Sequence, residues 1–236
     1  DDVAQLPQFR DKLKLSDPVA KYIPQFADLK TPSGKPANLT IAQLLTHTTG
    51  LAEIKRGAYA QHKTLEETIA GYFPAAPMLS EPGEKWKYTS FGFDTAGRIV
   101  EIVSGKSYDV FLQERLFDPL GMKDTTFYLS DDQFARLATN YARNGNTGAL
   151  DVRAHQFGRP VRGQFPPVPG GGLHSTAGDL ARFGQMLLNR GVLAGKRYLS
   201  EDAYRLLTTV HTGDLATGFS AGQFNHVRGR VIGAYV

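Results

Sequence analysis

The residues with the clearest chemical potential are Tyr88 and Ser90, in the stretch 82–93. A Pro-Gly pair begins this stretch, and apolar residues after Ser90 recur at three- and four-residue spacing until Gly105, which predicts an amphipathic helix. Tyr88 should therefore lie just before a helix N-terminus, where unpaired N–H groups and the helix dipole favour a nearby negative charge. A phenol in such a place ionises more readily than in water, so Tyr88 is a candidate general acid or base.

The same two residues also have a structural interpretation. Tyr88 could be an ordinary half-buried aromatic residue. Ser90 could be the N-cap of the helix, accepting a hydrogen bond from a backbone amide of the first turn. The spacing of the residues alone leaves both interpretations open.

Five short motifs lie along the chain. The central one is Pro82-Gly-x-x-Trp-x-Tyr-x-Ser90. The others begin with Leu15-Ser-Asp-Pro-Val, Leu39-Thr-Ile-Ala-Gln, Leu116-Phe-Asp-Pro-Leu and Pro169-Gly-Gly-Gly-Leu. In type and order they resemble the motifs of the superfamily of serine β-lactamases, penicillin-binding proteins and family VIII carboxylesterases, whose middle motif reads Tyr-x-Asn or Tyr-x-Ser. The resemblance spans most of the chain, and it indicates the family more strongly than any one activity.

The resemblance implies an α+β fold of the β-lactamase/D,D-peptidase type. In that fold a helical subdomain lies beside an antiparallel sheet flanked by helices, with the active site in the cleft between them. We expect residues 1–236 to form a single but incomplete domain, because this chain would supply mainly the helical part. Residues 25–190 would be mainly helical, and residues 223–236 would form a strand of the sheet.

The resemblance also implies acyl transfer through an acyl-serine intermediate, without a cofactor. Tyr88 would act as general acid/base, and Ser90 would donate a hydrogen bond. Trp86, Gly171 and Gly172 would contact the substrate, a small ester or lactam. Because Ser90 replaces the Asn usual in class C β-lactamases and D-Ala carboxypeptidases, a carboxylesterase acting on short acyl esters is favoured. A β-lactamase or D-Ala-D-Ala carboxypeptidase and a non-catalytic binding or scaffold protein of the same fold are the alternatives.

The nucleophile expected from the resemblance is a serine three residues before a lysine, because one helical turn places the hydroxyl beside the amine. None of the serines in the sequence has a lysine at that spacing. In the family this motif precedes the one that begins at Leu15, and fourteen residues precede Leu15 here. We therefore expect the nucleophile segment to be missing, with chain breaks near residues 2–6 and 220–227.

Two further motifs match catalytic patterns by their letters. His211-Thr-Gly213 resembles the third family motif, but it follows a predicted helix and runs into turn residues, so a loop is favoured. The stretch 218–222 matches the Gly-x-Ser-x-Gly elbow around Ser220, but only His226 follows as a partner and no acid does. We expect neither motif to be catalytic. Since no His-x-x-x-His pair occurs, a catalytic metal is not expected either.

Local signals predict the elements that position these residues. Capping boxes begin helices after Thr40 and Thr64, and His47 is expected to be a structural donor to carbonyls at the end of the first. The other expected elements are a helix from Ser107 through Leu116 ending at 119–121, a helix capped by Ser175 or Thr176, a helix capped by Ser200, paired extended segments around 144–148, an extended connection between Pro18 and Pro24, and a strand over 227–236.

The composition sets the outer limits. The 236 residues are 41% hydrophobic and 21% charged with a net charge of +4, typical of a soluble globular protein. No run of like charges indicates nucleic-acid or membrane binding, and no apolar run is long enough for a transmembrane segment. The absence of cysteine excludes disulfides and thiol catalysis. A cytoplasmic and a periplasmic or secreted location both fit, and the oligomeric state is not indicated.

Overall fold

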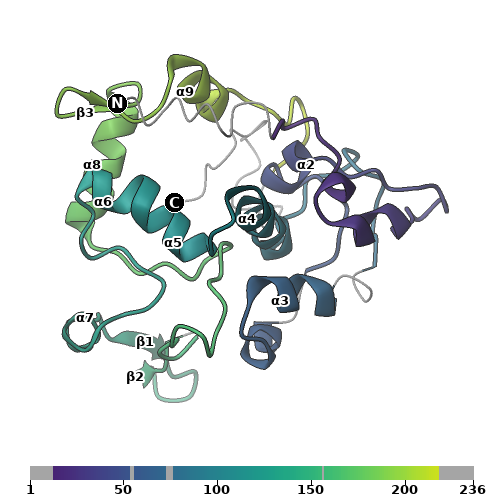
Figure 1. The fold of residues 1–236 in the computed structure, drawn as a ribbon. Helices are drawn as coiled ribbons and strands as arrows, with labels where there is room; N and C mark the ends of the chain where they lie inside the picture. Colours follow the sequence, from purple (N-terminus) through teal and green to yellow (C-terminus); the bar gives the residue numbers. More distant parts are fainter. Residues whose placement is uncertain (1–12, 54–55, 73–76, 156, 218–236) are drawn as a thin grey trace.

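The computed structural model describes residues 13–53, 56–72, 77–155 and 157–217. The described chain is mainly helical (Figure 1). Its elements are the 3₁₀ helices η1 (Val19–Lys21), η2 (Pro24–Asp28) and η3 (Arg56–Gln61), the π-helical turn η5 (Gln113–Phe117), the helices α2 (Ile41–Leu45), α3 (Leu65–Tyr72), α4 (Ser90–Ser104), α5 (Tyr108–Leu112), α6 (Asp118–Leu120), α7 (Asp131–Ala135), α8 (Ala177–Leu188) and α9 (Glu201–Thr208), and the strands β1 (Asn140–Arg143), β2 (Leu150–Arg153), β3 (Val192–Leu193) and β4 (Lys196–Arg197).

Helix α4 lies at the centre of the described chain, between α2, α3 and α5 (Figure 1). Its apolar side contributes Phe91 and Ile99 to the main core, where both are fully buried. Leu44 of α2 and Leu65 of α3 are buried in the same cluster, and the ring of Phe91 stacks on Phe26 at 6.3 Å. Burial of each such side chain stabilises the fold by about 1.5–3 kcal/mol, so this cluster fixes α4 against α2 and α3.

The predicted helix after Tyr88 is confirmed as α4, and it ends before Gly105 at a φ of 70°. Its N-cap, however, is Thr89 rather than Ser90. Thr89 has an extended backbone, and its side-chain oxygen accepts the Gly92 N–H at 3.2 Å, whereas Ser90 is already the first helical residue. The interpretation of Ser90 as the cap is therefore wrong. Either hydroxyl could cap the helix, but only Thr89 has the extended backbone conformation of an N-cap residue.

A second, smaller core joins α8 to the segment from α5 to α6. Its buried members are Phe117, Leu120, Met122 and Met186. The helix predicted from Ser107 through Leu116 is confirmed. It runs on through the π-helical turn η5 and α6 and ends at Leu120, within the expected 119–121. Ser107 occupies the N-cap position without making a side-chain capping bond.

The remaining helix starts follow their local signals. Thr40 and Thr64 each form a reciprocal capping box with the glutamine or glutamate three residues later. Thr176, and not Ser175, caps α8 by accepting the Asp179 N–H at 3.2 Å, and Ser200 caps α9. Since each cap involves residues at most four positions apart, the sequence contains the information needed to place it.

The segment between Pro18 and Pro24 differs from the expected extended connection. It forms the 3₁₀ helix η1 and leads into η2, with Val19 completely buried and Phe26 nearly so. The Val19 N–H donates to the Leu39 carbonyl at 2.8 Å. Burial of these apolar residues against the core overrode the local preference of the prolines.

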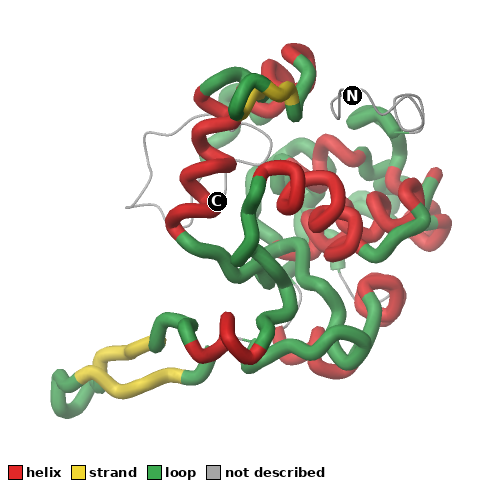
Figure 2. Tube along the Cα trace, turned by 60° about the vertical axis from the view of Figure 1, so that its left-hand side comes forward, coloured by secondary structure: helices red, strands yellow, loops and turns green. Residues whose placement is uncertain are grey.

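Two short antiparallel hairpins supply the strands of the described chain. In the first, β1 pairs with β2 in the register Asn140↔Arg153 and Arg143↔Leu150, and the predicted turn at 144–148 connects them. Figure 2 shows this hairpin extending away from the helices. The second joins β3 to β4. The strand expected at 223–236 and the two expected chain breaks lie outside the described residues.

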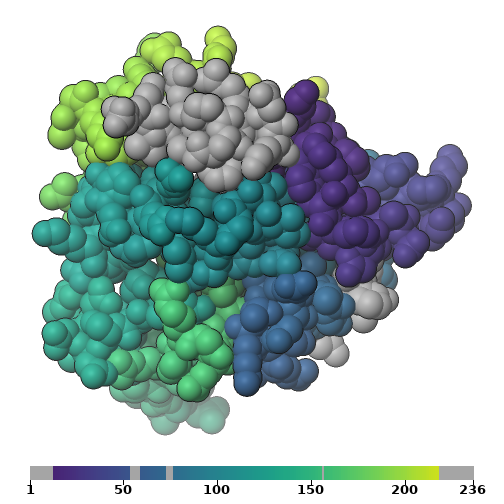
Figure 3. Space-filling view, viewed as in Figure 1, coloured from purple at the N-terminus to yellow at the C-terminus, as the bar shows by residue number. Residues whose placement is uncertain are grey.

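The loop that precedes α8 lies against α4 and α3. A Cβ atom at Gly97 of α4 would meet both Pro169 of this loop and Leu65 of α3, so the three segments are in contact. In the space-filling view the green residues before α8 lie beside the blue residues of α3 (Figure 3). Within the described part of the chain, none of the helices has the length and apolar character needed to cross a bilayer.

Candidate active site

A cavity of about 470 Å³ lies between the start of α4 and α8, and Tyr88 forms part of its wall. Phe93 of α4 and His47 line the cavity near Tyr88. The other lining residues are Leu116, Phe117, Met122, Thr125, Pro169, Gly170, Gly171, Leu173, Ser175, Leu180 and Phe183. Most of these side chains are apolar, so the cavity suits an apolar group beside a single phenol and two hydroxyls.

His47 holds the segment that carries Tyr88. The carbonyl of His47 accepts the Lys87 N–H at 2.8 Å, and its Nδ1 accepts the Thr89 N–H at 3.3 Å. The histidine is therefore an acceptor, which corrects the expectation that it donates to carbonyls; with Nδ1 accepting, a neutral ring carries its proton on Nε2. The rings of His47 and Tyr88 lie 4.7 Å apart, and Trp86 meets His47 edge-on at 5.7 Å.

The first turn of α4 holds a carboxylate. The Ser90 N–H donates to Oε2 of Glu53 at 2.8 Å. A negative charge at a helix N-terminus is favoured by the helix dipole and by the unpaired amides there. Glu53 therefore anchors the helix start immediately after Tyr88.

The predicted site residues divide into two groups. Tyr88 and Gly171 line the cavity. Of the residues that the structure describes, Trp86, Ser90 and Gly172 do not line it but lie against residues that do. Trp86 packs on His47, and Ser90 packs so closely on Gly170 that a Cβ atom there would lie 2.9 Å from the Ser90 carbonyl oxygen. Gly172 is buried next to Gly171. The structure thus gathers all five around one cavity wall.

Sequence reasoning missed Asp94, a fully buried acid on α4. Its Oδ1 accepts the Gly170 N–H at 2.9 Å, and its Oδ2 accepts the hydroxyl of Tyr59. Burial raises the pKa of Asp94 to about 7. Burial and the nearby Asp94 also raise the pKa of Tyr59 above its ordinary value. The available signal was a carboxylate four residues after Ser90, among the apolar residues of an amphipathic helix.

Two hydroxyls in the cavity wall belong to a separate network. The hydroxyls of Thr125 and Ser175, both lining the cavity, lie 2.8 Å apart. Thr125 also donates to Asp179 at 2.9 Å, and Asp179 accepts the Asp124 N–H at 2.8 Å. This network ties α8 to the segment after α6, and it gives the cavity a polar patch apart from Tyr88.

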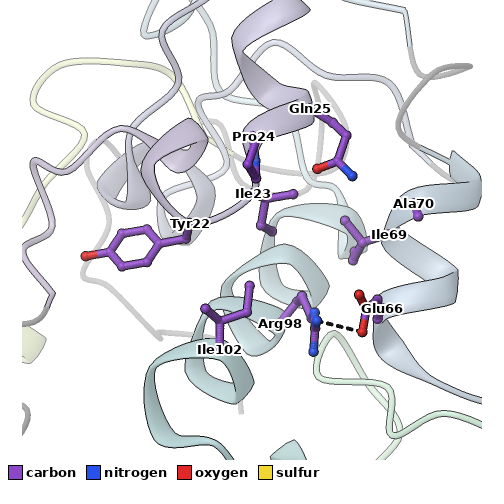
Figure 4. A pocket seen from close by; sticks show the side chains of 9 residues that line it. All are labelled: Tyr22, Ile23, Pro24, Gln25, Glu66, Ile69, Ala70, Arg98 and Ile102. Carbon is purple, nitrogen blue, oxygen red and sulfur yellow. Dashed lines mark ion pairs between the residues drawn. The ribbon is translucent and has the colours of Figure 1, made fainter.

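A smaller cavity of about 170 Å³ lies between η2, α3 and α4 (Figure 4). Ile23, Ile69 and Ile102 line it, together with Arg98. Arg98 pairs with Glu66 at 2.7 Å and with Glu101 at 3.1 Å. Its cation is already bound by two carboxylates, and the described lining residues include no candidate nucleophile, so this cavity has the character of a packing gap beside an ion pair.

The two motifs that matched catalytic patterns by their letters have different outcomes. His211-Thr-Gly213 lies in a turn after α9, and the His211 ring is 2.7 Å from the Leu206 carbonyl through Nε2. The expected loop is confirmed. Ser220, His226 and the whole 218–222 stretch lie outside the described residues.

Comparison with known proteins places this chain in a family. Residues 8–230 match the family model described as Beta-lactamase. D-alanyl-D-alanine-carboxypeptidase/endopeptidase AmpH of Escherichia coli (strain K12) is 30% identical over 197 residues, which are 82% of this chain and 44% of AmpH. Lovastatin esterase of Penicillium rubens is 32% identical over 197 residues, which are 74% of this chain and 47% of the esterase.

Solved structures agree. Simvastatin synthase LovD from Aspergillus terreus superposes with a TM-score of 0.66 at 26% identity, covering 91% of this chain and 56% of LovD. The chain therefore spans about half the length of these relatives. Its helices and small antiparallel hairpins form an α+β structure of the β-lactamase/transpeptidase type. Together, the match over residues 8–230 and the shared fold show that the chain belongs to the Beta-lactamase family, a family of serine hydrolase-like proteins.

Proposed function

We propose that this chain forms part of a serine hydrolase that acts through an acyl-enzyme, and that its substrates are esters with short acyl groups. The observation that carries the proposal is the placement of Tyr88 in the wall of a mainly apolar cavity, immediately before the N-terminus of α4. The phenol lies in this wall beside His47, and the apolar side chains around it provide space for an acyl or alcohol group.

In the proposed reaction, a serine hydroxyl attacks the carbonyl carbon of the ester. Tyr88 accepts the hydroxyl proton and passes it to the oxygen of the leaving alcohol, so the carbon–oxygen bond of the ester breaks and an acyl-serine forms. Water then attacks the acyl-serine, and Tyr88 transfers the proton of the water to the serine oxygen. Because the 236 residues contain no Ser-x-x-Lys, the proposal assigns the nucleophile and its lysine to a part of the protein outside this sequence.

The apolar lining supports an ester rather than a charged peptide as substrate. Phe93, Phe183 and Leu180 are among the side chains that an acyl group would contact. One of the relatives is named as an esterase, the lovastatin esterase of Penicillium rubens. The similarity to AmpH favours D-alanyl-D-alanine carboxypeptidase activity as the second candidate, and a β-lactamase belongs to the same alternative.

The test is hydrolysis of a short p-nitrophenyl ester by the full-length protein that contains this chain. Replacement Tyr88→Phe should lower kcat by about 10²–10⁴-fold, because it removes the proton carrier. The matched control is Tyr141→Phe, since Tyr141 is 58% exposed on the β1–β2 hairpin and should leave kcat unchanged.

Three outcomes separate the candidates. A Tyr88→Phe variant that keeps more than about a third of its kcat would remove Tyr88 from the mechanism. Hydrolysis of a D-alanyl-D-alanine peptide or a β-lactam in preference to the ester would favour the second candidate. Failure of a fluorophosphonate to label the protein, together with absence of hydrolysis, would favour a binding protein that kept the fold without the nucleophile.

A further inference from the structure

One face of α4 is shaped to hold the loop that contains Gly170. Ser90, Asp94 and Gly97 are four and three residues apart, so they lie on the same face of the helix. Ser90 packs against Gly170, where a Cβ atom would lie 2.9 Å from the Ser90 Cβ. Gly97 leaves space for Pro169. The loop is thus fitted to the helix at both ends of this face, with Asp94 between them.

Asp94 makes the hydrogen bonds that join the loop to the helix. Its Oδ1 accepts the Gly170 N–H at 2.9 Å, and its Oδ2 accepts the Tyr59 hydroxyl. One carboxyl group therefore connects α4, the 3₁₀ helix η3 and the loop. Tyr59 extends the connection, because its ring meets Phe157 at 5.9 Å.

Within the part of the chain that the structure describes, no cation is found among the groups that act on Asp94. These groups are the phenol of Tyr59, the carboxylate of Glu53 and the amide of Gly170. Asp94 in turn acts on the phenol of Tyr108. A buried carboxylate without a cation is costly, so an apolar residue would serve packing better. The presence of an acid at position 94 is better explained by its hydrogen bonds to the Gly170 amide and the Tyr59 hydroxyl.

We propose that Asp94 is a positioning residue of the hydrolase: its carboxyl group fixes the Gly170 amide, and with it the Pro169–Gly171 wall of the cavity, with a strength that depends on whether Asp94 is ionised. The catalytic part of this inference rests on the proposed function. The structural part, the hold on Gly170, stands independently of any activity.

Ionisation changes the hold for a definite reason. An ionised carboxylate accepts the Gly170 N–H and the Tyr59 O–H together, and a bond to a charged acceptor is about twice as strong as a neutral one. When Asp94 gains a proton, one oxygen becomes a donor, so Asp94 can donate to the Tyr59 hydroxyl instead of accepting from it. The Gly170 N–H then meets a neutral acceptor, and the loop is held less firmly. Because the pKa of Asp94 is raised to about 7, this change falls near neutral pH.

The direct test uses the Gly170 amide as its own reporter. The 236 residues contain two Pro-Gly pairs, Pro82-Gly83 and Pro169-Gly170. Labelling the proline carbonyl carbon with ¹³C and the glycine nitrogen with ¹⁵N in the full-length protein therefore limits the amide signals from these 236 residues to those of Gly83 and Gly170, and loss of the signal in Gly170→Ala assigns the one that belongs to Gly170. Gly83 is the internal control, because its N–H donates to the Thr48 carbonyl at 2.8 Å and not to an acid.

We expect the Gly170 signal to move between pH 5 and pH 9 with a midpoint near 7, and the Gly83 signal to stay in place. Asp94→Asn keeps an oxygen acceptor for Gly170 but cannot ionise, so its Gly170 signal should not titrate. A Gly170 signal that does not move in the unmodified protein, or that moves equally in Asp94→Asn, overturns the proposal.

Activity provides the second readout. Asp94→Asn should keep kcat/KM within about three-fold but lose the step near neutral pH, whereas Asp94→Leu should lose at least about ten-fold, as expected when a catalytic wall shifts. A folded Asp94→Leu variant with unchanged kcat/KM would overturn the positioning role, even if Gly170 titrates. If Asp94→Leu does not fold, the pH profile of Asp94→Asn decides. If the protein hydrolyses no ester, the proposed function fails. The Gly170 titration then still tests whether the carboxyl group of Asp94 fixes the Gly170 amide.

Discussion

Replacement of Gly97 by alanine should move the cavity wall from behind. A Cβ atom at Gly97 would lie 3.0 Å from the Cβ of Pro169 and closer still to its Cγ. Carbon atoms in contact normally lie about 3.5–4.0 Å apart. Pro169 would therefore have to move by about 1 Å to reach ordinary contact. Pro169 lines the cavity, so a substitution at Gly97, which is not one of the described lining residues, should still change the shape of the cavity.

Two opposing contributions determine the stability of this variant. Alanine is preferred to glycine inside a helix by about 0.8–1.0 kcal/mol. Forcing an extra methyl group into a filled contact costs about 1–3 kcal/mol. We expect the free energy of unfolding to fall by about 0–2 kcal/mol, the difference between these terms. A displacement of about 1 Å at a catalytic wall can cost about 10²-fold in rate, so kcat/KM should respond more strongly than stability.

The matched control is Gly184→Ala in the middle of α8. Among the described residues, no atom outside its own stretch of helix lies within 4 Å of the position where its Cβ would be. The same substitution should therefore raise the free energy of unfolding by about 0.8–1.0 kcal/mol and leave kcat/KM unchanged. Urea unfolding can be followed by the fluorescence of Trp86, the only tryptophan in the 236 residues, and activity by p-nitrophenyl ester hydrolysis.

The two variants together test whether Pro169 rests on α4 at Gly97. If Gly97→Ala gains as much stability as Gly184→Ala and keeps its kcat/KM, then Pro169 does not rest on α4 as described. A loss of stability without a loss of activity would show that the loop shifts without affecting the substrate. Either result would remove the link between this helix face and the cavity.

Three other results are expected from urea unfolding. Thr89→Ala should lower the free energy of unfolding by about 1 kcal/mol through loss of the cap of α4, and Thr89→Ser should restore most of it. Phe91→Ala should lower it by about 3–5 kcal/mol, because Phe91 is fully buried. The pKa of Asp94 is raised from 3.8 to about 7, so the folded protein keeps a proton that the unfolded chain releases; stability should fall as pH rises from about 4 to 7, and Asp94→Asn should flatten that fall.

The parts of the fold that the sequence predicted depend on neighbours within one helical turn. The capping box of Thr40, the cap at Ser200 and the stop at Gly105 each involve residues at most four positions apart. The choice between Thr89 and Ser90 failed because both can cap, and only their backbone angles separate them. The 3₁₀ helix η1 was missed since the burial of Val19 depends on contacts with Leu39 and the rest of the core.

The site was predictable where its residues lie in family motifs, at Tyr88 in the central motif and at Gly171 in the motif that begins at Pro169. Tyr88 was found because its motif is local and family-specific, and its role stays a prediction. Asp94 was not found, because its bond to Gly170 joins residues 76 positions apart, and the bond of Thr89 to His47 joins residues 42 apart. Periodicity shows which face of a helix is buried, but it does not show what covers that face.

The burial of helix α4 also limits which substitutions it can accept during evolution. Its buried residues are Phe91, Gly92, Asp94, Thr95, Gly97 and Ile99. At 3.6 residues per turn they cover about 220° of the helix circumference. In α9, by contrast, no residue is buried. Random substitutions should therefore be accepted at most positions of α9 and at few positions of α4. Over long divergence the sequence of α9 would lose its similarity to related chains. The sequence that begins at Tyr88 would stay similar, because the residues packed around α4 exclude most substitutions.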